Sequence, residues 1–173
     1  VLVDQYSATS LPDVYAAGDL ANWWHPQLGE RLRVEHYDNA SNQGIAAARG
    51  DFVVFMDNDV ALRTRSWIET LLCCLSSDPH IAVVGPRLVY PFASHCIQCA
   101  GVGISKSGRV LFRGRGDARE DRRYAQRSEV QCLISACIMI PRRLVADTGG
   151  FDEAFNPVQY EDFDLCYRLR SRG

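Results

Sequence analysis

The sequence lacks an excess of charge of either sign. Its 173 residues hold 19 lysines and arginines against 21 aspartates and glutamates, a formal net charge of −2. Proteins dedicated to nucleic acids carry a basic excess, so we expect no nucleic-acid partner. No apolar run approaches the roughly 20 residues of a membrane-spanning helix. We therefore expect a cytoplasmic protein that associates with the membrane at most peripherally, at the inner face of the membrane.

Cysteine is also scarce for a disulfide-built scaffold. There are seven cysteines, an odd number, and most lie in apolar runs. This pattern predicts buried free thiols in a reducing compartment. The start of the chain has neither a Met nor the basic and apolar regions of a secretory signal. An apolar share of 47% and a charged share of 23% are typical of a globular domain.

From residue 44 on, apolar runs typical of strands alternate with stretches typical of helices. Strands alternating with helices predict an α/β fold with an at least partly parallel sheet. Turn residues at the centre of segment 101–112 predict a hairpin there. A charged, arginine-rich stretch at 114–127 predicts a mobile loop. The expected central strands are residues 52–56, 81–84 and 131–140, and the expected helices include residues 66–77 and 160–172.

Two aspartates directly follow the first of these strands. In open α/β sheets, ligands bind beyond the carboxyl ends of the strands. If the backbone stays extended, Asp57 and Asp59 point to one side while Asn58 points away. Paired carboxylates suit Mg²⁺ or Mn²⁺, which also takes substrate phosphates as ligands. The alternative is a polar strand end where aspartate serves as a turn or cap residue.

This motif and several later segments, in the same order, resemble family 2 glycosyltransferases. The resemblance covers about residues 44–173, and Cys99 stands where the family usually has His. It is strongest toward bacterial members that build rhamnose-containing or similar cell-surface polysaccharides. The segments that carry it are residues 46–59, 84–90, 97–103, 135–143, 149–155 and 160–166.

The resemblance implies a GT-A-like, Rossmann-like α/β fold with a mixed, mainly parallel sheet and flanking helices, truncated at both ends. It implies inverting, metal-dependent transfer of a hexosyl or rhamnosyl group. The donor would be a nucleotide-diphosphate sugar, and the acceptor would be a saccharide or lipid-linked. By motif position, Asp57 and Asp59 would bind the donor, with Asp59 also ligating the metal. Asp162 would be the general base that removes the proton of the acceptor hydroxyl.

The same resemblance implies that three further acids contact the acceptor: Asp152, Glu153 and Glu161. Acids at a helix start also complement the helix dipole, and this is the stronger explanation for Glu161. Two nearby aromatic residues, Phe151 and Phe155, fit core packing better than an acceptor pocket.

Residues 1–43 resemble a different family. Segments 3–6, 12–19 and 33–40 are similar to the FAD-binding segment of ferredoxin-reductase-type pyridine-nucleotide flavoproteins. This resemblance implies FAD contacts by Asp19, Glu35 and His36, although turn chemistry also explains Asp19. The Gly-rich dinucleotide fingerprint is absent.

Two alternatives to a glycosyltransferase therefore stay open: a fragment of an FAD-dependent NAD(P)H oxidoreductase, and an inactive chimeric fragment. We expect residues 1–43 not to form an independent domain, and residues 44–173 to form a partial family 2 domain.

Overall fold

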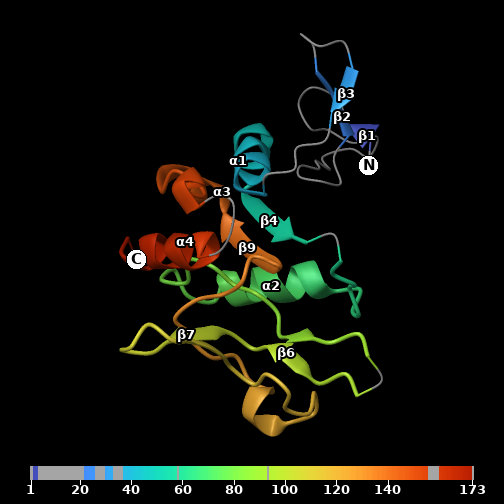
Figure 1. Ribbon diagram of the computed structural model, residues 1–173, viewed down its shortest axis with the longest axis vertical. Coiled ribbons are helices and arrows are strands. Elements are labelled where there is room, and N and C mark those ends of the chain that lie inside the picture. Colours follow the sequence, from blue (N-terminus) through green and yellow to red (C-terminus); the bar gives the residue numbers. More distant parts are fainter. Residues whose placement is uncertain are drawn as a thin grey trace.

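The structure is a computed structural model. It describes residues 2–3, 22–25, 30–32, 37–57, 59–92, 94–155 and 160–172. Three short strands, β1 (Leu2–Val3), β2 (Asn22–His25) and β3 (Glu30–Leu32), form a small sheet at one end of the molecule (Figure 1). β1 and β2 run parallel, and β2 and β3 antiparallel.

The central sheet is built around β9 (Cys137–Pro141). β9 pairs with β4 (Phe52–Met56) in an antiparallel register that runs from Phe52 opposite Pro141 to Met56 opposite Cys137. On its other edge, β9 makes an antiparallel bridge between Met139 and Val84. The three predicted apolar runs therefore do meet in one sheet, although 81–83 and 131–136 lie outside its strands.

The described pairings of the central sheet neither confirm nor contradict the prediction of a mixed, mainly parallel sheet. β4 and the Val84 segment run in the same direction, but β9 lies between them, so both described pairings are antiparallel. Residues 137–140 are buried throughout, because helices cover both faces of the strand. A continuous apolar run reports burial on two faces, and it does not report strand direction. β4 was expected to be buried, but Phe52 and Met56 at its ends are 39% and 44% exposed.

Helices cover the two faces of this sheet (Figure 1). α2 (Trp67–Leu75) packs Leu71 and Leu75 against Met139 on one face. Ile138 and Ile140, which point the other way, pack with α1 (Tyr37–Ala47), α3 (Arg142–Asp147) and α4 (Glu161–Arg170). The predicted helices at 66–77 and 160–172 are thus confirmed, with slightly shorter bounds.

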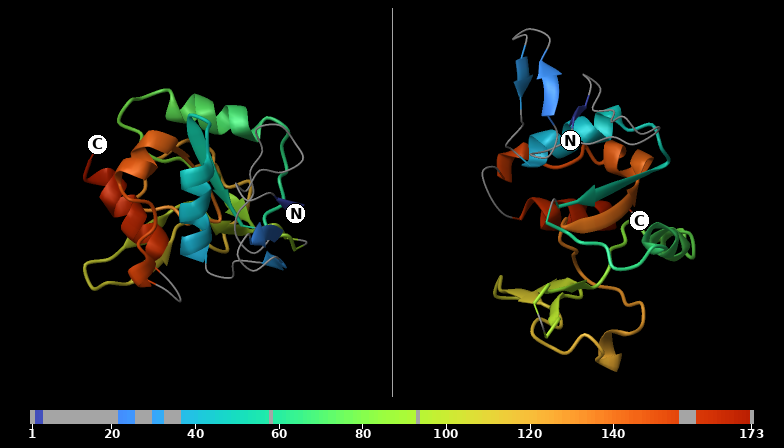
Figure 2. Two further views of the ribbon diagram at one scale, coloured as in Figure 1. Left: turned by 90° about the horizontal axis from the view of Figure 1, so that it is seen from above. Right: turned by 90° about the vertical axis from the view of Figure 1, so that its right-hand side faces the viewer.

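Short strands at the other end of the molecule form two antiparallel pairs (Figure 2). β5 (Leu88–Val89) pairs with β6 (Ile97–Cys99), and β7 (Val102–Ile104) pairs with β8 (Val110–Phe112). The second pair confirms the predicted hairpin, whose turn contains Gly108 at a φ of +79°.

The arginine-rich stretch after the hairpin is tied down by its own side chains. It includes a short 3₁₀ turn, η1 (Arg122–Tyr124). Arg123 forms ion pairs with Asp117 at 3.1 Å and Asp121 at 2.7 Å, and the Tyr124 hydroxyl donates to Asp117 at 2.5 Å. These contacts bind residues of the loop to one another, and the expectation that the loop is mobile stays a prediction.

α4 belongs to two cores at once. Leu165 and Leu169 join the core under the central sheet, and Phe163 and Cys166 join a second core with Val102 of the hairpin. The start of α4 is therefore held between the sheet and the hairpin. A second 3₁₀ turn, η2 (Glu153–Phe155), precedes it in the chain.

Candidate functional site

Asp162 lies in the first turn of α4 and is 9% exposed. Its Oδ2 accepts a hydrogen bond from the Ser135 backbone N–H at 3.3 Å. Burial and the neighbouring carboxylate of Glu161 raise the pKa of Asp162 to about 6, against the weaker opposing effect of backbone hydrogen bonds. A carboxylate with this pKa accepts a proton near neutral pH more readily than an exposed aspartate does.

The residues beside Asp162 are in unusual states. Glu161 places its Oε2 out of contact with solvent, and among the described residues this oxygen has no hydrogen-bond partner. Tyr160, which precedes α4, has a φ of +78°, a left-handed conformation that is uncommon for a residue with a side chain. Strained backbone and unsatisfied buried oxygens both concentrate at functional sites.

These residues open onto a cavity of about 300 Å³, which we call the Asp162 cavity. Apolar and aromatic side chains form most of its wall, and two carboxylates form the rest. The described residues that line it include no cationic side chain. They are Val110, Phe112, Ile134, Tyr160, Glu161, Asp162 and Phe163.

Asp57 and Asp59 lie at the carboxyl end of β4, as the sequence predicts. The Asp57 N–H donates to the Ala136 carbonyl at 3.0 Å, and the Asp57 carbonyl accepts from the Val60 N–H at 3.2 Å. The second bond closes a turn that leaves Asp59 exposed. Asp59 has no hydrogen bond or ion pair with any other described residue. Asp57 is half-buried and does interact with other groups. Burial, and secondarily the charge of Asp57, raise the pKa of the Cys137 thiol.

One short segment links the two acidic sites. Ser135 contacts the Asp162 carboxylate, and its neighbour Ala136 contacts the Asp57 backbone. The segment that leads into β9 therefore fixes the end of β4 and the start of α4 relative to each other. Asp57 and Asp59 do not line the Asp162 cavity itself.

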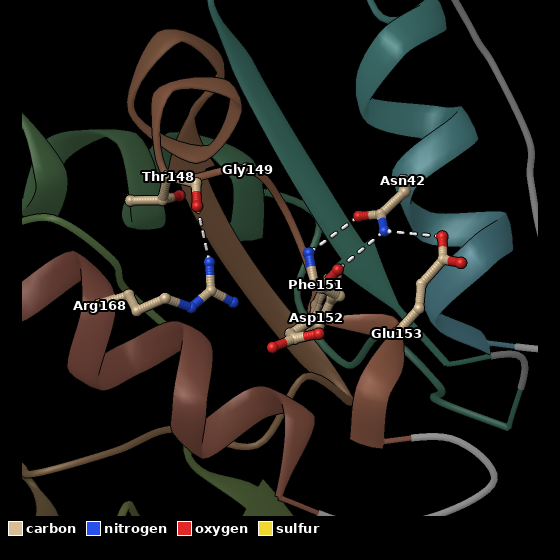
Figure 3. A pocket seen from close by; sticks show the side chains of 7 residues that line it. All are labelled: Asn42, Thr148, Gly149, Phe151, Asp152, Glu153 and Arg168. Carbon is tan, nitrogen blue, oxygen red and sulfur yellow. Dashed lines mark hydrogen bonds between the residues drawn. The ribbon is translucent and has the colours of Figure 1, made fainter.

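The other two predicted acceptor residues, Asp152 and Glu153, line a different cavity of about 420 Å³ (Figure 3). We call it the Arg168 cavity. Asp152 Oδ1 accepts from the Ala154 N–H at 2.9 Å, and Glu153 Oε1 accepts from Asn42 Nδ2 at 3.3 Å. The described residues that line it are Asn42, Thr148, Gly149, Phe151, Asp152, Glu153 and Arg168.

Asn42 and Arg168 hold this second cavity together, and sequence reasoning did not find either. Asn42 Nδ2 donates to the Phe151 carbonyl at 2.9 Å, and its Oδ1 accepts from the Phe151 N–H at 2.8 Å (Figure 3). Gly150 has a φ of +72°, and a Cβ there would collide with the Asn42 amide. The Phe151 side chain is buried against Phe55, with ring centroids 5.1 Å apart, which confirms core packing.

Arg168 binds the end of α3. Its Nη1 donates to the Thr148 carbonyl and its Nη2 to the Gly150 carbonyl, both at 2.8 Å, while Nε donates to Asp164 at 2.6 Å. The spacing of Asp164 and Arg168, four residues apart on one helix, is the signal that could have identified this pair.

Comparison with known proteins places these sites in a family. Residues 36–172 match the model of the family described as "Glycosyltransferase like family 2". The chain belongs to this family. The match spans every described element from α1 to α4, and it includes the Asp57–Asp59 turn and the Asp162 cavity.

Three relatives of the family 2 domain come from bacteria. The pre-mycofactocin glycosyltransferase of Mycobacterium tuberculosis is 34% identical over 134 residues, which cover 78% of this chain and 26% of that protein. The O-antigen biosynthesis protein RfbC of Myxococcus xanthus is 27% identical over 179 residues, covering 94% and 13%. The uncharacterized protein y4gI of Sinorhizobium fredii is 29% identical over 168 residues, covering 90% and 18%. The chain thus spans between 13% and 26% of the length of these relatives.

The comparisons do not support a flavoprotein segment in residues 1–43. The family match begins at residue 36, and the match to the O-antigen protein leaves only about ten residues of this chain uncovered. That second match therefore runs through most of the N-terminal segment. The FAD contacts expected of Asp19, Glu35 and His36 fall outside the described residues. A few short motifs without the Gly-rich fingerprint were too little to define a second family.

Two further properties bear on the family 2 domain. Within the described ranges, no helix is both long and apolar enough to cross a membrane. The same residues contain no group of three or more His, Cys, Asp or Glu side chains that could by itself enclose a metal ion.

Proposed function

We propose that this family 2 domain transfers a glycosyl group from a nucleotide-diphosphate sugar to a hydroxyl of a saccharide or lipid-linked acceptor, with inversion at the anomeric carbon. The observation that carries the proposal is Asp162, a buried carboxylate with a pKa of about 6 at the wall of a cavity. Family membership and the names of two relatives support the same class of reaction.

Asp162 acts as the general base in this proposal. Above its pKa of about 6 the carboxylate is ionised and takes the proton of the acceptor hydroxyl. The acceptor oxygen forms a bond to the anomeric carbon, and the bond from that carbon to the phosphate oxygen breaks. The electron pair leaves with the nucleoside diphosphate. The Ser135 N–H orients the carboxylate by its hydrogen bond to Oδ2.

Asp57 and Asp59 form the donor side of the site in this proposal. Mg²⁺ and Mn²⁺ are commonly held by only one or two protein carboxylates together with substrate phosphates. The exposed, unpaired Asp59 at a strand end fits this role, with Asp57 beside it. When bound, the divalent cation would neutralise charge on the departing diphosphate.

Calorimetry tests the donor side. Titration with Mn²⁺ and a nucleoside diphosphate is expected to give saturable binding that Asp59→Ala weakens at least tenfold. The matched control is Asp51→Ala, an exposed aspartate at the opposite end of the same strand, which should leave binding unchanged. Equal affinity of Asp59→Ala and the unmodified protein would refute the metal assignment.

A panel of nucleotide-diphosphate sugars tests the reaction itself. We expect one or more donors to release nucleoside diphosphate in the presence of glycoside acceptors, with the product of inverted anomeric configuration by NMR. A product of retained configuration would exclude the direct displacement with Asp162 as base.

A further inference from the structure

Two buried cysteines meet in the core between α4 and the hairpin. Cys132 is 1% exposed and Cys166 is 4% exposed, and both are free thiols. The Leu133 N–H donates to Cys166 Sγ at 3.4 Å, and the Leu133 carbonyl lies 3.6 Å from the same sulfur. The Cys132 sulfur is a second acceptor within hydrogen-bonding reach of the Cys166 thiol. Segments 33 residues apart in the chain therefore bring two thiols together.

The surroundings give the two sulfurs different reactivity. A hydrogen bond from the Cys166 thiol lowers the pKa of Cys132, against the opposing effect of burial. The Tyr167 hydroxyl and the charge of Arg170 act in the same direction. The pKa of Cys166 is raised, first by its neighbour Cys132 and then by burial. Because the thiolate is the nucleophile, Cys132 is the sulfur that reacts first and Cys166 the one that follows.

The side chains that cover this pair reach solvent or a cavity. Tyr167, whose hydroxyl is hydrogen-bonded to Cys132, is 43% exposed. Phe163 belongs to the same core as the two cysteines and Ile134 packs against it, and both also line the Asp162 cavity. A small oxidant therefore needs only a local opening of the structure to reach Cys132.

We propose that Cys132 and Cys166 form a reversible disulfide when the protein meets a hydroperoxide. The Cys132 sulfur attacks one peroxide oxygen, the O–O bond breaks, and the leaving oxygen takes a proton, which gives a sulfenic acid and water or an alcohol. The Cys166 sulfur then attacks the Cys132 sulfur, the S–S bond forms and the S–O bond breaks. Hydroxide leaves as water with the proton of Cys166. The thiols lose two electrons and two protons, and the peroxide gains them.

Zinc is the competing partner of two neighbouring thiols. A structural zinc ion takes four ligands. The part of the chain that the structure describes holds no group of three or more His, Cys, Asp or Glu side chains around one point. Cys99, the third buried cysteine of this core, donates instead to the Gly101 carbonyl at 3.4 Å. The pair therefore fits a disulfide better than a metal site.

The disulfide would brace Asp162. Cys166 follows Asp162 by four residues on α4, so both lie on the same side of the helix. Cys132 precedes Ser135 by three residues, and the Ser135 N–H donates to Asp162. The new bond closes a covalent ring around this hydrogen bond, so oxidation should keep it formed for longer. The disulfide itself does not depend on the proposed function.

Peptide mapping of the full chain tests the link. The protein is treated with hydrogen peroxide, its remaining thiols are alkylated before denaturation, and it is digested with trypsin without reductant. We expect peptide 128–142 joined to peptide 144–168, two hydrogens lighter than the two free peptides together. Fragmentation must place the link at Cys132 and not at Cys137, which shares the first peptide. Dithiothreitol should release both peptides. Links between other cysteines only, or Cys132 recovered only as a sulfinic acid, would overturn the proposal.

Variants connect the link to its physical effect. The oxidised protein should melt about 5 °C or more above the reduced one, because the cross-link restricts the unfolded chain. Exchange of the Ser135 amide hydrogen, followed by NMR, should slow about tenfold. Cys132→Ala and Cys166→Ala should each remove both changes, and Cys99→Ala, from the same core, should keep them.

Two results decide the outcome. If Cys166→Ala shows the same rise in melting temperature as the unmodified protein, the pair is not the site of oxidation. If a cysteine variant fails to fold, the peptide map of the unmodified protein still identifies or excludes the link. Loss of glycosyl transfer in every assay would refute the proposed function and leave this disulfide unaffected, because the map requires no donor or acceptor.

Discussion

The two cavities of this domain share α4 and both contain acids that motif position assigns to the acceptor, yet their chemistry differs. In the Arg168 cavity, Arg168 makes three hydrogen bonds, and Glu153 accepts one from Asn42. In the Asp162 cavity, Glu161 has a buried oxygen without a partner among the described residues, and Asp162 has a raised pKa.

The difference gives a criterion by which we expect structural acids to differ from functional ones. Where carboxylates and cations satisfy one another, they hold elements together and have little capacity left for a ligand. Where burial is not compensated, the group stores free energy that a substrate can release, and its pKa moves toward neutral. By this criterion, Glu161 is a stronger acceptor candidate than Asp152 or Glu153.

We expect the largest effect in the Asp162 cavity, on the rate of glycosyl transfer. Asp162→Asn should lower the transfer rate at saturating donor by about a hundredfold or more, because the amide cannot take the acceptor proton. Glu153→Gln in the other cavity is the control and should retain the rate. The measurement is product formation by each variant. If Glu153→Gln is inactive and Asp162→Asn is active, the general base is not Asp162 and lies in the Arg168 cavity instead.

The pH dependence sharpens the same contrast. Because the base works only when ionised and Asp162 has a pKa of about 6, kcat/KM should fall about tenfold per pH unit below that value. Glu161→Gln removes a neighbouring negative charge and should move this limb to lower pH. The rate profiles of both proteins from pH 4 to 9 provide the check. A limb that stays in place would mean that Glu161 does not act on Asp162.

Arg168 represents the structural side of the comparison. Arg168→Ala should lower the free energy of unfolding by about 2–3 kcal/mol, since it frees two carbonyls at the end of α3 and the partly buried Asp164. Arg168→Lys should recover only part of this loss, because an ammonium lacks the planar fork that reaches both carbonyls. Urea unfolding measures both. Full recovery by lysine would reduce the role of Arg168 to its charge.

The ionised Asp162 side chain, in contrast to Arg168, should lower the free energy of unfolding. Its pKa rises from 3.8 to about 6 on folding, so the folded state binds the proton more tightly, and stability falls as pH rises through this window. Asp162→Asn should therefore be more stable than the unmodified protein by about 3 kcal/mol at pH 8. The gain should disappear by about pH 3, below both pKa values, where both states are mostly protonated. Unfolding curves at pH 3, 6 and 8 test this. A gain independent of pH would point to packing rather than ionisation.

The smallest effects distinguish two residues within the Arg168 cavity. Asn42→Ala removes both hydrogen bonds to the Phe151 backbone and should cost about 1–2 kcal/mol of unfolding free energy. Glu153→Gln should change it by less than about 0.5 kcal/mol, because the carboxylate is exposed and an amide oxygen still accepts from Asn42. Thermal unfolding resolves the two values. A larger loss of unfolding free energy in Glu153→Gln would show that the hydrogen bond between Asn42 and Glu153 depends on the charge of the carboxylate.

Local pattern predicted the elements well and their pairing poorly. The turn residues of the β7–β8 hairpin and the apolar face of α2 both depend on neighbours in sequence, and the structure contains both. The direction of β4 against β9 depends on segments about 85 residues apart, and the local pattern did not predict that the two strands run antiparallel. Motif order also identified the Asp57–Asp59 turn and Asp162. Whether these acids hold donor, metal and acceptor stays a prediction.

By itself, the sequence determined the family, the order of the elements and the acids at the end of β4 and the start of α4. Those are properties of residue type and local spacing. Only the tertiary structure separated the two groups of acids. Asp162 is oriented by Ser135, which lies 27 residues away, and Asn42 binds Phe151 across 109 residues. Burial and hydrogen-bond partners fix the charge state of a side chain, and both are supplied by distant segments that meet only when the chain is folded.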